Sequence, residues 1–353
     1  MVGPVRRAIL GMADLYVLAW AGAIVLGFLV LNQGAKLLTD NAVYVARKFG
    51  QSRFVVGVLL VSTLAALPEV LVSVIALREG SPSIALGNAL SSCVVTVGFV
   101  IGLAAIIKPV KTTREIALRD AVFLATFTIV ASALLLDGHL TAYEGLVLIA
   151  LFIPYTVNLY ISQKDAPRDE VEEIVRDIKI ELAMTGWIFG RRVEIRAGPR
   201  WLVFGVLWAV MGAQFIVQGA IQLSRPEQLG IDPWLLAITV VAFGTSLPDI
   251  AASYHASKKG YSDLALGEGI GASIVTLLLT LGIMGLMTPM TYDVVRILPM
   301  IVGVVGSSFM ILVFMLSGRM MGKKAGIALM IFYVVTVVVN VVLFGYDGGN
   351  PFT

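Results

Sequence analysis

The sequence predicts an all-α membrane protein in which ten transmembrane helices form two inverted five-helix repeats. Three observations lead to this prediction: the composition, a proline-centred motif that occurs twice, and the distribution of basic residues. Of the 353 residues, 58% are hydrophobic and 14% are charged, and the mean hydropathy is +0.91, far above that of a soluble domain. The chain therefore needs a lipid bilayer around it.

Apolar runs of about 20 residues, enough to cross the ~30 Å hydrocarbon core, recur along the chain. The first run follows Arg6 and Arg7, as in a signal peptide, but it is long and lacks a convincing small-residue cleavage site. We therefore expect it to be retained as a helix. The ten expected helices are centred near Val25, Val61, Val95, Leu124, Leu148, Leu207, Val240, Leu277, Val304 and Val335.

Basic residues are concentrated in the loops that follow odd-numbered helices, with 20 on that side and five on the other. The positive-inside rule then predicts that these loops are cytoplasmic and that both termini are extracytoplasmic, in a multi-pass protein of the cell membrane. The lone cysteine, Cys93, falls in the third helix. An intramolecular disulfide is therefore excluded, and the redox compartment is not indicated.

The stretch LAALPEV (Leu64 to Val70) recurs as GTSLPDI (Gly244 to Ile250). Residues 61–103 and 241–283 align without a gap and match at 12 of 43 positions. The matches include a proline and three glycines at the same spacing, which unrelated apolar segments seldom share. These two motifs therefore indicate an internal duplication.

The similarity extends upstream, where residues 34–50 parallel residues 212–224. We therefore predict a first five-helix repeat over residues 1–163, a polar cytoplasmic linker over 164–200 and a second repeat over 201–353. Because five is odd, the copies are inverted relative to one another. Inverted repeats with interrupted helices are typical of secondary transporters, whose substrate site lies near the bilayer midplane.

In the linker, apolar residues recur at helical spacing, which predicts an amphipathic helix at the membrane interface. These residues are Val171, Ile174, Val175, Ile178 and Leu182. A regulatory ion sensor is not indicated, because no carboxylate-rich loop with calcium-binding spacing is present.

A proline in the middle of a membrane helix predicts unpaired backbone oxygens. Because proline has no N–H and clashes with the preceding turn, Pro68 should release the carbonyl oxygen of Leu64. Pro248 should do the same for Gly244. Irregular backbone is tolerated in lipid only where it faces protein or a water-filled cavity. Such an oxygen is a ready ligand for a cation.

An acid follows each proline directly: Glu69 in the first repeat and Asp249 in the second. Intramembrane acids cost about 2.5–3.5 kcal/mol and mark ion or proton pathways. Since the two acids occupy equivalent, inverted positions, we expect them to converge on one midplane site. A local kink with a protonated acid explains two symmetric acids poorly. An all-oxygen ligand set suits Ca²⁺, and less comfortably Mg²⁺ or Mn²⁺, whereas the isolated His139 and His255 do not indicate zinc.

The next helix of each motif supplies further candidate oxygens. Asn88, Ser92 and Thr96 are spaced i, i+4, i+8 and share one face. Their equivalents in the second repeat are Glu268, Ala272 and Thr276. Glu268 is either a third carboxylate on the ion path, able to relay a proton, or a solvated acid at a helix start. For the small residues, a packing seam is the alternative.

The stretch VVAFGTSLPDI, followed by DLALGEGIGASI, resembles the second α-repeat of the calcium/cation antiporter superfamily, which includes the sodium/calcium exchangers. STLAALPEVLVSVIAL with IALGNALSSCVVT resembles the first α-repeat. The resemblance covers essentially the whole chain in the order and number of helices. It implies alternating access and the exchange of cytoplasmic Ca²⁺ for Na⁺ or H⁺.

By position, the resemblance assigns Glu69 and Asp249 to the two central cation-binding acids. Thr245 matches a threonine whose oxygen binds the ion, and Ser246 matches a sodium-site serine. The other expected site residues are Leu64, Ala65, Gly244, Ser92, Thr96, Thr276 and Glu268.

The sequence departs from the family pattern mainly at side chains that would hold sodium. Ala65 and Ala66 replace a Thr-Ser pair, and Ala272 lacks a serine hydroxyl. Thr96 and Thr276 replace the usual Asn or Asp. Two carboxylates in a dehydrated site repel one another, so at least one should take up a proton when the cation leaves. Proton coupling therefore stays an alternative to sodium coupling.

These observations predict a secondary-active antiporter that exports Ca²⁺ or a related divalent cation. The alternatives are a proton-coupled Mg²⁺ or Mn²⁺ exchanger, and an uncoupled channel or cation-binding protein on the same scaffold. An intramembrane hydrolase is disfavoured because the acids have no nucleophile–base partner. We expect no enzymatic activity, no cofactor and no nucleic-acid partner, and the sequence does not indicate the oligomeric state.

Overall fold

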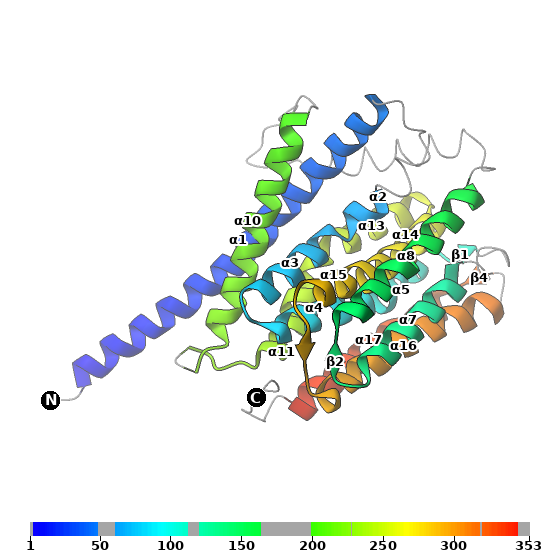
Figure 1. Ribbon diagram of the computed structural model, residues 1–353. Helices are drawn as coiled ribbons and strands as arrows, with labels where there is room; N and C mark the ends of the chain where they lie inside the picture. The colour runs from blue at the N-terminus through cyan, green and yellow to red at the C-terminus, as the bar shows by residue number, and fades with distance from the viewer. Residues whose placement is uncertain are drawn as a thin grey trace.

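The structure is a computed structural model that describes residues 3–48, 61–111, 120–163, 199–226, 228–317 and 320–344. The predicted linker helix lies outside these residues. The described chain is almost entirely helical (Figure 1), which confirms the all-α class. The first half contains α1 (Gly3–Lys48), α2 (Val61–Ala65), α3 (Leu67–Arg78), α4 (Pro82–Val94), the π-helical η2 (Val95–Val100), α5 (Ile101–Ile107), β1 (Val110–Lys111), α7 (Val122–Leu135), β2 (His139–Leu140) and α8 (Ala142–Gln163).

The second half repeats this order of elements. It contains α10 (Pro199–Leu223), α11 (Pro233–Leu236), the π-helical η4 (Ala237–Val241), α12 (Ala242–Thr245), α13 (Leu247–Lys259), α14 (Ser262–Val275), the π-helical η5 (Thr276–Thr280), α15 (Leu281–Met287), β3 (Met290–Thr291), α16 (Val294–Ser317), β4 (Met320–Met321) and α17 (Lys323–Phe344).

Within the described residues, six helical spans are long and apolar enough to cross a membrane. They are Leu15–Leu38, Pro82–Ile107, Arg200–Leu223, Ala265–Met287, Val294–Ser317 and Lys323–Phe344. A seventh span is the bent pair Pro233–Thr245 and Leu247–Lys259, with a bend of 44°, and two shorter apolar helices cover Val122–Leu135 and Ala142–Asn158. Each of the ten predicted centres falls on helical residues. The number of membrane crossings, ten, stays a prediction.

Two short antiparallel ribbons join the halves. β1 pairs with β4, and β2 pairs with β3, so each ribbon takes one strand from each half. At the centre of the molecule, the thiol of Cys93 lies 3.6 Å from the carbonyl oxygen of Ser273, 180 residues further along the chain. A residue that contacts its own repeat mate lies on the axis that relates the copies. The two-repeat organisation predicted from the sequence is therefore confirmed.

Both motifs fold as helical hairpins, α3–α4 and α13–α14, that turn at equivalent glycines. Gly80 has φ of 74° and Gly260 has φ of 105°, a left-handed conformation that glycine adopts without steric cost. In each turn, the amide of the next residue donates to the carbonyl five residues earlier, at 2.9 Å. The glycine match in the sequence therefore reflects a shared turn.

The helix breaks lie two residues before the prolines. In the first half the chain leaves the helix at Ala66, and in the second half at Ser246. Pro68 and Pro248 fall in the first turn of the following helix, where the missing N–H has no intrahelical acceptor to lose. The predicted interruption is present, and the proline starts the new helix rather than breaking an old one.

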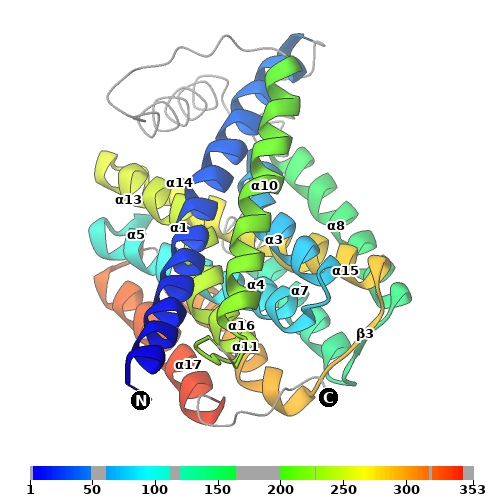
Figure 2. The ribbon, with the colours of Figure 1, turned by 90° about the vertical axis from the view of Figure 1, so that its left-hand side faces the viewer.

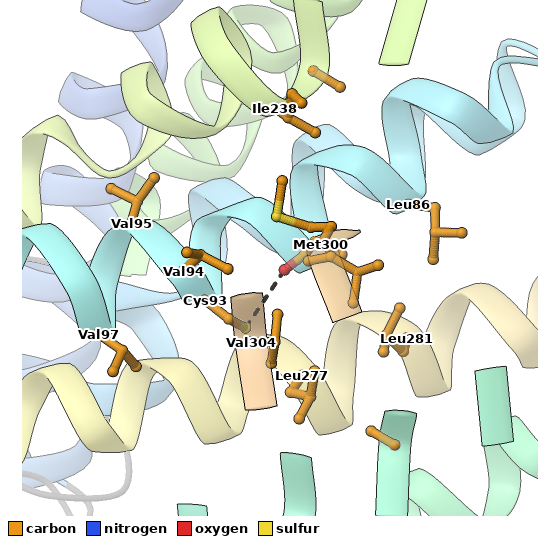
Figure 3. Close-up of a cluster of buried hydrophobic side chains, with 14 of the residues drawn as sticks. Leu86, Cys93, Val94, Val95, Val97, Ile238, Leu277, Leu281, Met300 and Val304 are labelled. Carbon is orange, nitrogen blue, oxygen red and sulfur yellow. Dashed lines mark hydrogen bonds between the residues drawn. The ribbon is translucent and has the colours of Figure 1, made fainter. Parts of the chain in front are cut away.

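The helices α1 and α10 pack side by side along the face of the bundle (Figures 1 and 2). They approach closely at small residues, with Gly34 of α1 against Ala209 of α10 and Gly212 of α10 against Leu31. Behind them, apolar side chains of both halves form one core. Figure 3 shows side chains of both halves in this core, among them Leu86 and Val94 of the first half and Leu277 and Leu281 of the second.

Candidate cation-binding site

Both motif acids lie in the first turn of a helix that starts inside the membrane protein. Glu69 is in the first turn of α3 and Asp249 in the first turn of α13. The Leu-Pro-acid order places each carboxylate third in its helix, next to backbone N–H groups that have no intrahelical partner. The positive end of the helix dipole stabilises negative charge at this position. The local sequence thus creates two inverted anionic sites.

Glu69 is almost completely buried, with 2% of its surface exposed. Its Oε1 accepts a hydrogen bond of 3.4 Å from Oγ of Ser246, in the other half of the molecule. Its Oε2 is buried and has no hydrogen-bond partner among the described residues. Leaving a buried charged acceptor unpaired costs several kcal/mol, more than a neutral group. The geometry therefore favours a cation or a proton at this oxygen.

Asp249 is partly buried, and its carboxylate interacts electrostatically with the carboxylates of both Glu69 and Glu268. Like charges in a low-dielectric interior repel strongly, so the three acids together favour positive charge nearby. Asp249, Ser253 and Glu268 also line one narrow crevice. The other residues that line it are Val100, Ala265, Gly269 and Ala272. The second-half hairpin thus places two carboxylates, those of Asp249 and Glu268, along one narrow crevice.

Asn88, one of the candidate oxygens predicted on the second helix of the first motif, connects the two halves at the site. Its Nδ2 donates to the main-chain oxygen of Glu69 at 3.1 Å and to Oγ of Ser73 at 2.9 Å. Its Oδ1 accepts from Oγ1 of Thr245 at 3.4 Å. Two features of the sequence indicate a role for Asn88 at the site: it shares a helix face with Ser92 and Thr96, and a serine lies one turn after each acid. The partners themselves depend on tertiary packing.

Three other candidates on this part of the fold are buried without contacting an acid. Ser92 is 1% exposed, Thr96 4% and Thr276 3%. Oγ of Ser92 has no hydrogen-bond partner among the described residues, and no hydrogen bond within them joins any of the three to Glu69 or Asp249. Thr96 and Thr276 lie in the π-helical turns η2 and η5, a conformation often found at functional sites.

The backbone candidates differ between the halves. Leu64 and Ala65 are half-buried in α2. The amide of Ser246 donates to the carbonyl oxygen of Ala242 at 3.2 Å, and Pro248 has no N–H to donate to Gly244, so the Gly244 oxygen stays a predicted ligand. A Cβ atom on Gly244 would collide with the ring of Phe28 in α1. The glycine is therefore explained by the close approach of α1.

Among the described residues, no group of three or more His, Cys, Asp or Glu side chains has the geometry of a metal site. A cation held by Glu69 and Asp249 would complete its shell with hydroxyl oxygens, main-chain oxygens and water. This ligand set suits a hard cation such as Ca²⁺, which takes six to eight oxygens in flexible geometry. It does not suit zinc, which prefers nitrogen and sulfur ligands.

Comparison with known proteins gives consistent matches. The family model described as sodium/calcium exchanger protein matches residues 19–161 and 198–342. The putative antiporter CaxA of Alkalimonas amylolytica is 30% identical over 270 residues, which cover 76% of this chain and 81% of that protein. The sodium/calcium exchanger MaX1 of Methanosarcina acetivorans is 26% identical, covering 90% of this chain and 97% of MaX1.

Solved structures agree. A structure of the sodium-calcium exchanger NCX_Mj, soaked with Na⁺ and Sr²⁺, superposes with a TM-score of 0.58 at 27% identity, covering 91% of this chain and 99% of that one. The two matched ranges fall in the two repeats, and the gap between these ranges coincides with the region around the predicted linker. The chain therefore belongs to the sodium/calcium exchanger family, whose members are multi-pass membrane cation antiporters rather than enzymes.

Proposed function

We propose that this protein is a secondary-active antiporter that exports Ca²⁺, or a related divalent cation, in exchange for Na⁺ or H⁺ by alternating access. In this proposal, Glu69 and Asp249 bind the transported cation. The observation that carries it is the unpaired, buried Oε2 of Glu69 within electrostatic range of Asp249. A divalent cation neutralises both carboxylates at once, whereas a single positive charge bound to either acid would leave the other carboxylate uncompensated.

The named substrates of the relatives support calcium as the divalent ion. MaX1 is a sodium/calcium exchanger by name, and NCX_Mj was solved with Na⁺ and Sr²⁺, the latter a heavier relative of Ca²⁺. Thr245 and Ser246 lie next to the acids and offer hydroxyl oxygens. We assign them as auxiliary ligands.

The side chains around the site favour protons as the coupling ion. Ala65 and Ala272 carry no oxygen where the family resemblance places sodium ligands. Glu268 instead lines the crevice beside Asp249, where a third carboxylate can receive a proton while the cation leaves. Sodium coupling, and Mg²⁺ or Mn²⁺ as the exported ion, are the alternatives.

The crevice and the basic residues support entry of the cation from the cytoplasmic side. From Asp249, α13 leads to Lys258 and Lys259 at its far end, in a loop that the positive-inside rule assigns to the cytoplasm. We infer that the divalent cation enters from the cytoplasm past Glu268.

Transport by the purified protein in lipid vesicles tests the proposal. We expect ⁴⁵Ca uptake to follow an imposed pH gradient and to be faster when unlabelled Ca²⁺ is present on the opposite side. Uptake that depends on a sodium gradient and ignores pH would replace the proton with sodium. Flux that is not accelerated by ion on the opposite side would indicate a channel and overturn antiport.

A further inference from the structure

Among the described residues, Asn88 is the polar side chain on α4 whose hydrogen bonds join the main chain of Glu69 to Thr245 of the second half. It is completely buried, at 0% exposure. Both of its N–H donors are used within the first half, on the main chain of Glu69 and on Ser73. Its oxygen accepts from Thr245 of the second half. The amide thus links the first turn of α3 to the break before α13.

The repeat mate of Asn88 is Glu268, and the two residues have opposite chemistry. An amide supplies donors without charge, whereas an ionised carboxylate can only accept. In the first half, the amide donates to Ser73. In the second half, Ser253 donates to the carbonyl oxygen of Val100 instead, at 3.2 Å, and a crevice is present between Ser253 and Glu268. The neutral amide donates to two oxygens of the first hairpin, whereas the acid of the second hairpin lines a crevice.

We propose that Asn88 is a positioning residue that sets the affinity of the site for the transported cation by fixing Glu69 relative to Thr245. This inference rests on the proposed function. Asn88 acts through its neighbours, because its donors bind protein oxygens and its own oxygen accepts from Thr245. Without the amide, α3 and the segment before α13 lose their polar link, and the carboxylate and hydroxyl oxygens no longer meet at one point.

The test compares Asn88→Ala with Ser91→Ala, a matched control on the same helix. Ser91 is also completely buried and also links the halves, through its hydrogen bond to the carbonyl oxygen of Ile238 at 2.9 Å, but it contacts neither acid. We expect Asn88→Ala to weaken Ca²⁺ binding by about tenfold, which is the value of one or two lost hydrogen bonds. Ser91→Ala should keep wild-type affinity at a similar loss of thermal stability.

If Asn88→Ala does not fold, Ser73→Ala removes one acceptor of the amide and should weaken binding about threefold. Wild-type affinity in whichever of these variants folds would overturn the positioning role. So would an equal loss of affinity in Ser91→Ala, which would make Asn88 merely structural.

A second readout does not require transport. The carboxyl infrared band of Glu69, identified by its loss in Glu69→Gln, should shift in Asn88→Ala and stay in place in Ser91→Ala. An unshifted band in Asn88→Ala contradicts the proposal. If the wild-type protein binds no divalent cation, the proposed function fails, and the infrared comparison still decides the role of Asn88.

Discussion

The α3–α4 and α13–α14 hairpins have the same backbone plan and different interiors. Both turn at a left-handed glycine and both start with a Leu-Pro-acid step. In the first hairpin, Glu69 and Asn88 are buried and linked to each other. In the second, Asp249 and Glu268 line a crevice. The duplication therefore preserved the fold of the site, while the polar side chains of the two hairpins diverged.

This difference predicts that the two acids contribute unequally to the proposed cation site. The first hairpin holds a carboxylate whose main chain is bonded to Asn88, and the second holds a carboxylate that lines a crevice with a second acid. If the two hairpins were chemically equivalent, the same kind of substitution would have the same effect in either of them. The experiments below are ordered from the largest expected effect to the smallest.

The two acids should be essential, but not equally so. Removing the charge with Glu69→Gln or Asp249→Asn should abolish divalent transport, with a loss of about 100-fold or more, since losing one partner of a buried charge interaction costs about 2–5 kcal/mol. Residual Ca²⁺ binding should be greater in Asp249→Asn, because Glu268 remains beside the site. Isothermal titration of both variants, after size-exclusion chromatography to verify folding, measures this. Wild-type transport in Glu69→Gln would remove that residue from the site.

Gly244, just before the second break, should be required for packing, whereas the equivalent position in the first half, Leu64, already carries a side chain. Gly244→Ala places a Cβ against Phe28 and should cost about 1–3 kcal/mol, the usual range for overpacking. Thermal unfolding in detergent measures the change. Phe28→Ala in the Gly244→Ala background should restore part of the stability. A fully stable Gly244→Ala protein would contradict the contact.

Glu268 should govern the response of the second hairpin to pH. In Glu268→Gln, the negative charge that repels the carboxylate of Asp249 is removed, so protons compete less strongly with Ca²⁺ for Asp249, and Ca²⁺ binding should persist to more acidic pH than in the wild type. The midpoint of binding against pH, measured with ⁴⁵Ca on purified protein, should fall by up to about one unit, equivalent to about 1.4 kcal/mol. The control is Asp263→Asn, on an exposed acid in the first turn of the same helix. Equal midpoints in Glu268→Gln and the wild type would identify Glu268 as a solvated acid.

Thr245 should have the smallest effect of the four. Thr245→Ala removes a hydroxyl and its contact with Asn88 and should weaken Ca²⁺ affinity only a few-fold, as expected for a hydrogen bond worth about 0.5–1.5 kcal/mol. Thr245→Ser keeps the hydroxyl and should bind as the wild type does. A loss in Thr245→Ser as large as in Thr245→Ala would show that the methyl group, rather than the oxygen, matters.

The sequence predicted those features that are repeated or local. Pro68 and Pro248, with Gly80 and Gly260, indicated two interrupted hairpins, because proline and glycine restrict or free the backbone wherever they occur. The position of each break, two residues before the proline, depends on where proline is tolerated in a first turn. The interruption was thus predicted, but its exact position was not.

Contacts between distant helices were not predictable from the same patterns. Gly244 contacts the ring of Phe28 because α1 passes close to α12. The sequence of neither helix indicates that the other helix packs there. The hydrogen bond from Thr245 to Asn88 spans 157 residues in the chain. The acids stood out because charge in an apolar run is costly anywhere. A buried asparagine is far less conspicuous, since its effect depends on which oxygens surround it.

The burial of Cys93 at the interface between the halves has a practical consequence for spectroscopy. This sulfur is the only thiol in the chain and is 2% exposed, so polar maleimide reagents have little access to it in the folded protein. A cysteine introduced on an exposed surface can thus carry a fluorophore or spin label selectively, without first replacing the native residue. Distances between such labels on α3 and α13 would follow the two hairpins during a transport cycle in the otherwise natural sequence.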